Sequence, residues 1–489
     1  MNDSFWFHNR TRLVALTVDL TSRRVLCFPC ICGYSNFVNN GQEMQTIAWV
    51  FLALTTLCVK LSGQETVEVD PVLSTTMPTI KKENVIANSI NNFGYKLLVK
   101  MMNEKKNNNI IISPTGVAGL LAMTLLGSVG TTHNEIAETL GFSQDILQNR
   151  KNHEHFGELL QALHTNVSSK TLYADAMFVD AHAPLRDLYR NYLSDVYRGD
   201  VLSVNFNQTE ETKNMINEWV NNHTEGHIEQ FLKQTLPLSS KVVLLSALYF
   251  SGQWEQPFIP EYTAKMSFKR PTDEVMADLM LNFGSFRYLF SVEHDLHIVA
   301  MPYNDSQTTM YALKPRFPKK LTLLDLMEKI DYEQIDHLIN QMDTRKCVIR
   351  FPKMELKSSI SLENTLKAVG IKTMFIPGEA NFALMINSNT VANKTEEEII
   401  TRLKDGEAEP KGERNMLDSL PNPGIHVDSI LHDVKLTINE YGTEAVAATS
   451  AILARSAEQF YADSPFYIFI RNERTKLVTF SAVIFDPTN

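Results

Sequence analysis

Apolar segments with helical spacing come first in this chain, and apolar segments typical of strands come later. This order constrains the fold most. A helical stripe at 86–101 is followed by a second, almost wholly apolar helix, which Ser113-Pro114 begins. Three later apolar runs indicate buried strands instead: 241–250, 348–351 and 478–484. Because the two kinds do not alternate as βαβ units, the sequence predicts an α+β fold.

The chain is long and apolar enough to bury one large core. Its 489 residues are 44% hydrophobic and 21% charged, which excludes a disordered chain. No internal repeat or Pro/Gly hinge divides residues 81–489, so we expect a single large domain there. The polar stretch 388–422 is predicted to be a charged, largely disordered surface insertion. The formal charge of −10 argues against nucleic acid as a partner.

The N-terminal region contains an apolar run at 47–59. The run is too short for a membrane span of about 20 residues and has the length of a secretory signal core. We therefore predict a signal peptide at 44–63, a disordered leader at 64–80, and a non-native or disordered extension at 1–43. The mature protein is then secreted to the extracellular space and has no membrane segment. The alternative is a type II signal anchor with Arg10, Arg12, Arg23 and Arg24 on the cytoplasmic side.

Four of the five cysteines lie before the predicted cleavage site: Cys27, Cys30, Cys32 and Cys58. No second pair at zinc-like spacing accompanies them, and only Cys347 remains in the mature chain, so we expect no metal site and no intramolecular disulfide. Five N-x-S/T sequons follow the signal and permit glycosylation: Asn166, Asn207, Asn222, Asn304 and Asn393.

Enzyme motifs are absent from the sequence. It contains no H-E-x-x-H, P-loop, G-x-S-x-G or G-x-G-x-x-G pattern, and its 13 histidines are scattered. We therefore predict no cofactor and no catalytic residue. A convergent catalytic triad does not need adjacent residues, so a secreted hydrolase is the rival hypothesis outside the predicted fold.

The stretch 439–466 carries the functional signal. Its Ala-rich centre favours a helix on composition. At a period of two, however, Thr443, Ala445, Ala447 and Thr449 form one small, uncharged face that fits the crowded middle of a sheet. No proline interrupts residues 442–455, so a strand is also allowed.

This stretch resembles the reactive loop of the serpin family. The segment 250–258 (FSGQWEQPF) is similar to that family's F-x-G-x-W-x-x-P-F motif, and 460–466 (FYADSPF) to the segment after its loop. Ser113-Pro114 and 351–353 extend the resemblance over residues 81–489. The residues that resemble the family's hinge are Glu440, Gly442, Thr443, Glu444, Ala445, Val446, Ala447, Ala448 and Thr449.

The resemblance implies the serpin fold, with a central, mainly antiparallel β-sheet, surrounding helices and an exposed reactive-centre loop. It also implies a secreted suicide inhibitor, which traps a serine protease as an acyl-enzyme while the cleaved loop inserts into the sheet. The small hinge residues favour an inhibitor over a non-inhibitory carrier or chaperone. We expect a monomer.

Further positions follow from the same resemblance. Lys353 and Glu440 match a charge pair near the top of the insertion site, and Trp254 matches the aromatic side chain that caps it. Ser113 and His432 match the gate through which the sheet opens. Ser246 stands where the family usually has Asn, so its hydrogen bond to His432 is expected to be weaker or water-mediated.

The reactive bond depends on the loop length. The common family spacing from Gly442 gives Ser456, whereas a loop shorter by one residue gives Arg455. We choose Arg455, because Arg forms a buried charge pair in the acidic pocket of a trypsin-like protease. Ser456 would indicate an elastase-like target. The region 153–164 has no basic cluster, so we expect little dependence on glycosaminoglycan.

Overall fold

The computed structural model describes residues 3–9, 12–19, 24–30, 79–163, 169–387, 401, 417, 420–441 and 457–488. The chain divides into two compact units, Met1–Thr76 and Met77–Asn489. In the first unit, β1 (Asp3–Asn9), β2 (Arg12–Asp19) and β3 (Arg24–Cys30) form an antiparallel sheet. No helix in the described ranges is long and apolar enough to span a membrane.

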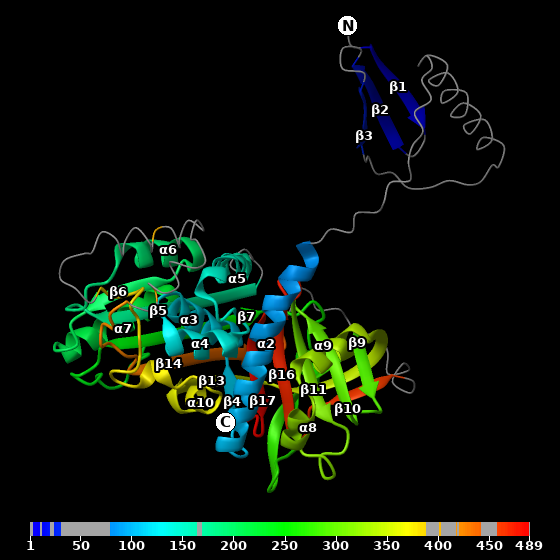
Figure 1. The fold of residues 1–489 in the computed structure, drawn as a ribbon. Coiled ribbons are helices and arrows are strands. Elements are labelled where there is room, and N and C mark those ends of the chain that lie inside the picture. Colours follow the sequence, from blue (N-terminus) through cyan, green and yellow to red (C-terminus); the bar gives the residue numbers. More distant parts are fainter. Residues whose placement is uncertain are drawn as a thin grey trace. The chain divides into compact units, whose positions relative to one another are not determined.

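The helices of the second unit surround its sheets (Figure 1). They are α2 (Thr79–Glu104), α3 (Pro114–Leu126), α4 (Gly130–Leu140), α5 (Arg150–Leu163), α6 (Asp187–Tyr197), α7 (Thr209–His223), α8 (Leu323–Lys329), α9 (Tyr332–Asn340) and α10 (Glu363–Ala368). Helix α3 begins as the sequence predicts, because the Ser113 side chain accepts a hydrogen bond from the Gly116 N–H and Pro114 occupies the first turn. All but the last residue of α3 is buried, so this helix runs through the core.

The central sheet has five strands in the order β13 (Met354–Ser361), β14 (Ser429–Ile438), β7 (Val242–Gly252), β5 (Ser169–Asp180) and β6 (Asp200–Val204). Strands β13 and β14 pair antiparallel, and so do β7 and β5. The pairs β14/β7 and β5/β6 are parallel. Two strands next to each other in the middle of the sheet, β14 and β7, therefore point the same way.

The second sheet has nine strands and is antiparallel except at one edge. Its order is β15 (Glu458–Tyr461), β12 (Asp343–Pro352), β9 (Glu274–Ser291), β10 (Leu296–Pro302), β11 (Thr308–Pro315), β16 (Phe466–Asn472), β17 (Val478–Ile484) and β4 (Ile110–Ile112), with β8 (Ala264–Lys269) on β9. Only β12 and β15 pair parallel. The apolar runs at 241–250, 348–351 and 478–484 lie in β7, β12 and β17, so these strand predictions are confirmed.

The predicted insertion at 388–422 lies mostly outside the described residues. Near its C-terminal end, Leu417 and Leu420 are buried in a small apolar cluster with Val129, Ala383 and Leu384. The end of this polar stretch is therefore packed against the body of the unit.

Candidate functional site

The predicted reactive loop begins at the end of β14. Residues 439–441 follow this strand directly. The next residue that the structure describes is Ala457, which precedes β15. The hinge positions from Gly442 to Thr449, and the predicted reactive bond at Arg455 and Ser456, lie outside the described residues. The site is therefore built from the roots of the loop and from the sheet beside it.

Trp254 holds the N-terminal root of the loop. Its backbone N–H donates to the Tyr441 carbonyl at 3.1 Å, and its indole N–H donates to the Asn439 carbonyl at 2.8 Å. The indole is buried and stacks on Tyr303, with 4.4 Å between ring centroids. Gly252 permits this packing, because a Cβ there would lie 2.6 Å from the Tyr303 ring. Local packing therefore explains why the FSGQWEQPF segment has Gly at position 252 and Trp at position 254.

The predicted charge pair lies at the same end of the sheet. The Lys353 ammonium is 2.9 Å from the Glu440 carboxylate, which also accepts a hydrogen bond from the Thr263 hydroxyl at 3.0 Å. Burial alone would raise the pKa of Glu440, but the hydrogen bonds from Lys353 and Thr263 keep it below its usual value. The hydrogen bond to Glu440 raises the pKa of Lys353. Both groups are therefore charged at neutral pH.

The seam, which we define as the pairing of β14 with β7, lies directly below this root. Its register runs from Ser429 opposite Val243 to Leu436 opposite Phe250. A segment that follows β14 and folds back beside it would run antiparallel to both strands. Inserting it would replace one parallel pair with two antiparallel pairs, which are slightly more stable per residue.

Three polar side chains form a row across the middle of the seam, which we call the middle row: Asp175 on β5, Ser246 on β7 and His432 on β14. Ser246 lies opposite both Asp175 and His432 in the strand registers. The Ser113 N–H donates to His432 Nε2 at 2.8 Å. Among the described residues, Asp175 Oδ1, Ser246 Oγ and His432 Nδ1 have no hydrogen-bond partner. The weakened Ser246–His432 bond expected from the sequence is thus not made directly.

Burial decides the protonation of the middle row. It lowers the pKa of His432 to about 4, so this imidazole is neutral at pH 7. Burial also raises the pKa of Asp175 to about 7, although the neighbouring Ser246 hydroxyl shifts this pKa in the opposite direction. Helix α3 approaches closely here: a Cβ at Gly116 would lie 2.6 Å from Ser246 Oγ. Ser246 therefore has little room on the side that faces α3, whereas Asp175 is partly buried and lines a pocket.

Sequence reasoning did not single out Asp175. The signal was one charged residue inside the otherwise apolar stretch 173–179, which forms a buried strand. A carboxylate in such a strand needs a partner or a shifted pKa. This requirement alone could have identified Asp175 as a candidate site residue.

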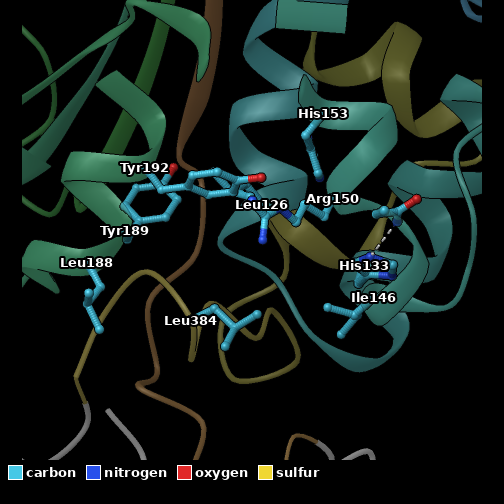
Figure 2. A pocket seen from close by; sticks show the side chains of 10 residues that line it. Leu126, His133, Ile146, Arg150, His153, Leu188, Tyr189, Tyr192 and Leu384 are labelled. Carbon is cyan, nitrogen blue, oxygen red and sulfur yellow. Dashed lines mark hydrogen bonds between the residues drawn. The ribbon is translucent and has the colours of Figure 1, made fainter. Parts of the chain in front are cut away.

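A small pocket of about 70 Å³ lies between α4, α5 and α6, and Figure 2 shows its lining. Its lining is mixed: Leu126, Ile146, Leu188 and Leu384 lie beside Tyr189, Tyr192, Asn149, Arg150 and two histidines. Burial lowers the pKa of His133 to about 4 and that of His153 to about 3. His153 Nδ1 is 2.5 Å from the Tyr197 hydroxyl, and His133 Nε2 is 3.1 Å from the Asn149 amide. The two imidazoles are thus neutral groups within a packed core. In the described ranges no three His, Cys, Asp or Glu side chains are placed to hold a metal ion.

Three of the five predicted sequons fall on described residues. Asn207 and Asn222 are exposed and Asn304 is half-buried, whereas Asn166 and Asn393 lie outside the described residues. Cys347 is buried in β12, and burial raises the pKa of its thiol to about 11.

Comparison with known proteins gives one consistent family. The sequence profile described as "Serpin (serine protease inhibitor)" matches residues 88–487. "Serine protease inhibitor 28Dc" of Drosophila melanogaster is 28% identical over 439 residues, which span 82% of this chain and 79% of the relative. "Plasminogen activator inhibitor 1" of Sus scrofa is 27% identical, over 83% of this chain and 93% of the relative.

Solved structures agree on the fold. Native protease nexin-1 with heparin has a TM-score of 0.68 and 23% identity, and covers 83% of this chain and 100% of its own. The thyroxine-binding globulin complex with thyroxine has a TM-score of 0.69 and 20% identity, with the same coverage. Uncleaved ovalbumin has a TM-score of 0.69 and 22% identity, and covers 82% of this chain and 100% of its own.

Proposed function

The chain belongs to the serpin family, whose members are protease inhibitors rather than enzymes, and we propose that it is a secreted suicide inhibitor of a trypsin-like serine protease. The protease serine attacks the carbonyl of Arg455, the Arg455–Ser456 peptide bond breaks, and Arg455 becomes esterified to the protease. The cleaved loop then inserts along the seam and carries the protease with it.

The single observation that supports this proposal is the parallel pairing of β14 with β7, with the loop attached at the end of β14. Residues 442–455, at about 3.3 Å per residue, make a strand of about 45 Å. That length is enough to move a bound protease from one end of the sheet toward the other.

The composition of the hinge supports an inhibitor. Thr443, Ala445, Ala447 and Thr449 would point to one face of the inserted strand, and all four are small and uncharged. A large or charged side chain in that position would slow insertion and let the protease hydrolyse the ester and leave.

Arg455 is the proposed specificity residue. A trypsin-like specificity pocket contains a carboxylate, which an Arg side chain pairs with and a Ser side chain does not. The proposal requires no glycosaminoglycan at α5: Arg150 and Lys151 are the only Arg or Lys residues of that helix, and Arg150 is paired with Glu154 at 2.7 Å.

Secretion belongs to the proposal too. The run 47–59 would serve as the signal core, with cleavage before Gln64, and the mature inhibitor would act as a monomer in the extracellular space. Asn207 and Asn222 are the sequons best placed for glycosylation, because both are exposed.

A non-inhibitory carrier is the second candidate, since thyroxine-binding globulin and ovalbumin have the same fold. Mixing the protein with trypsin and separating the products by SDS gel electrophoresis distinguishes the two. We expect an SDS-stable complex from an inhibitor. Cleavage of the loop without a complex would contradict inhibition.

Three variants make this experiment specific. Arg455→Ala should abolish the complex with trypsin, whereas Ser456→Ala should leave it. The reverse result would move the reactive bond to Ser456. Thr443→Arg should convert the inhibitor into a cleaved substrate, because a charged side chain obstructs insertion.

A further inference from the structure

The pocket that Asp175 lines has a volume of about 310 Å³ and lies at the β6 edge of the central sheet. Strands β5 and β6 lie side by side there (Figure 1), and residues of α3, α5, α6 and α7 supply the other walls. We call this pocket the edge cavity. Sites for small molecules have volumes of about 300–1,000 Å³, so the edge cavity has room for a ligand of modest size.

One part of the lining is apolar and consists of Met123, Leu160, Ala174 and Trp219. The Trp219 ring is fixed on two sides. It meets Phe178 edge-on with 5.9 Å between ring centroids, and His223 stacks on it at 4.1 Å. The cavity therefore offers a preformed apolar surface to the body of a ligand.

Three charged side chains also line the edge cavity: Asp175, Arg198 and Asp200. Asp200 already has partners, because its Oδ2 accepts a hydrogen bond from the Trp219 indole N–H at 3.0 Å and lies 3.7 Å from His223 Nε2. Arg198 is exposed. In the part of the chain that the structure describes, no ion pair joins Asp175 to Arg198 or to another basic side chain. Asp175 is thus a carboxyl group that faces a cavity without a cation.

The two oxygens of Asp175 define where a donor is missing. A Cβ at Gly119 would lie 3.5 Å from Oδ2, so this oxygen is on the α3 side of β5, where Gly119 also lines the edge cavity. Oδ1 is buried and has no hydrogen-bond partner among the described residues. Burial raises the pKa of Asp175 to about 7 against a smaller effect of the Ser246 hydroxyl. An ammonium group beside the carboxyl group would favour its ionised form and supply the missing donor.

We propose that the edge cavity binds a small primary amine with an apolar body, whose ammonium group donates to Asp175 and whose body packs against Met123, Leu160 and Trp219. An anion fits less well, because it would lie beside two carboxyl groups and one guanidinium. A metal ion lacks ligands, since no three His, Cys, Asp or Glu side chains of the described ranges are placed to hold one. This inference goes beyond the proposed function and does not depend on it.

A saturation-transfer NMR titration of the full chain with phenethylamine tests the proposal without a protease. Phenethyl alcohol has the same body without the ammonium group, and phenylpropionate carries a carboxylate in its place. We expect phenethylamine to bind more tightly than either compound by about tenfold or more, because a hydrogen bond to a charged group is lost in both.

Three variants locate the bound amine. Asp175→Asn keeps the shape of the side chain and removes its charge, so it should weaken phenethylamine binding by about tenfold. Asp433→Asn is the matched control: Asp433 is a partly buried aspartate of β14 outside the edge cavity, and burial raises its pKa to about 6. This variant should bind like the wild type. Leu160→Trp fills the cavity without changing its charges and should abolish binding, also if Asp175→Asn does not fold.

Several results would overturn the proposal: no binding of phenethylamine by the wild type, equal affinity for phenethyl alcohol, or equal losses in Asp175→Asn and Asp433→Asn. Unchanged affinity in Leu160→Trp would place the amine elsewhere on this acidic chain and would also overturn it. The trypsin complex is measured on separate samples. A missing complex would therefore contradict inhibition alone, and missing amine binding would contradict the edge cavity alone.

Discussion

The upper end of the seam and its middle are built in opposite ways. At the upper end, residues 439–441 are held by Trp254 and by the Lys353–Glu440 pair. In the middle row, Asp175, Ser246 and His432 lie side by side with unpaired polar atoms. A sheet that must open for an incoming strand benefits from weak bonding where it opens and firm anchoring where the loop begins. In the proposed insertion mechanism, the anchoring at the root of the loop and the weak bonding in the middle row would each have a role.

The largest expected change in stability comes from removing Trp254, which holds the root of the loop. Trp254→Ala deletes a buried indole that stacks on Tyr303 and donates to Asn439. We expect a loss of about 3–5 kcal/mol in the free energy of unfolding, measured by urea titration. Trp219→Ala, at a half-buried tryptophan on α7, is the matched control and should cost less. Equal losses would mean that the upper end is no firmer than an ordinary packed surface.

The second largest change in stability is expected in the middle row, where a substitution should stabilise the protein instead of destabilising it. Burial raises the pKa of Asp175 to about 7, above the unfolded value of about 4, so the wild type loses stability as pH rises between these values. Asp175→Asn removes that loss. We expect the variant to be about 2 kcal/mol more stable at pH near 8 and equal to the wild type at pH near 4.

Urea unfolding at both pH values checks this expectation, and the rate of trypsin complex formation should be measured on the same samples. A variant that is less stable than the wild type at pH near 8 would show that the carboxylate has a stabilising partner. The contrast between the two ends of the seam would then fail.

A smaller effect is expected at the charge pair. Lys353→Met leaves Glu440 buried without its ammonium partner, but Lys353 is about half exposed, so we expect a cost of about 1 kcal/mol at pH 7. The pKa of Glu440 is lowered in the folded state, so the pair stabilises above the unfolded pKa. The difference between variant and wild type should therefore shrink as pH falls below about 4. A cost independent of pH would instead indicate lost packing.

The smallest effect is expected at Ser246→Ala. The Ser246 hydroxyl has no hydrogen-bond partner among the described residues, so removing it should change the free energy of unfolding by less than about 0.5 kcal/mol. The same urea titration measures it. A loss of about 1 kcal/mol or more would reveal a hydrogen bond in the middle row and weaken the comparison.

Local patterns made much of the fold predictable. Helix α3 follows from Ser113, Pro114 and an apolar run, because capping and burial depend on neighbouring residues. Strands β7 and β17 are continuous apolar runs, which are recognisable without knowing what pairs with them. The parallel pairing of β14 with β7 depends on residues almost two hundred positions apart, and no local pattern records it.

The candidate site was predictable only in part, for the same reason. The contact between Lys353 and Glu440 was expected from the family resemblance, and the structure places the two groups together. Asp175 is recognisable in the sequence as one charge in an apolar stretch, but its place beside Ser246 and His432 follows only from the strand registers.

The most direct test of strand insertion is a crystal structure of the protein after cleavage at Arg455. If the loop inserts, the cleaved protein should have a central sheet of six strands, in which residues 443–453 lie antiparallel between β14 and β7 and hydrogen-bond to both. The register that now joins Ser429 to Val243 and Leu436 to Phe250 would be gone. A cleaved protein that keeps β14 paired with β7, with the cut loop outside the sheet, would contradict the account.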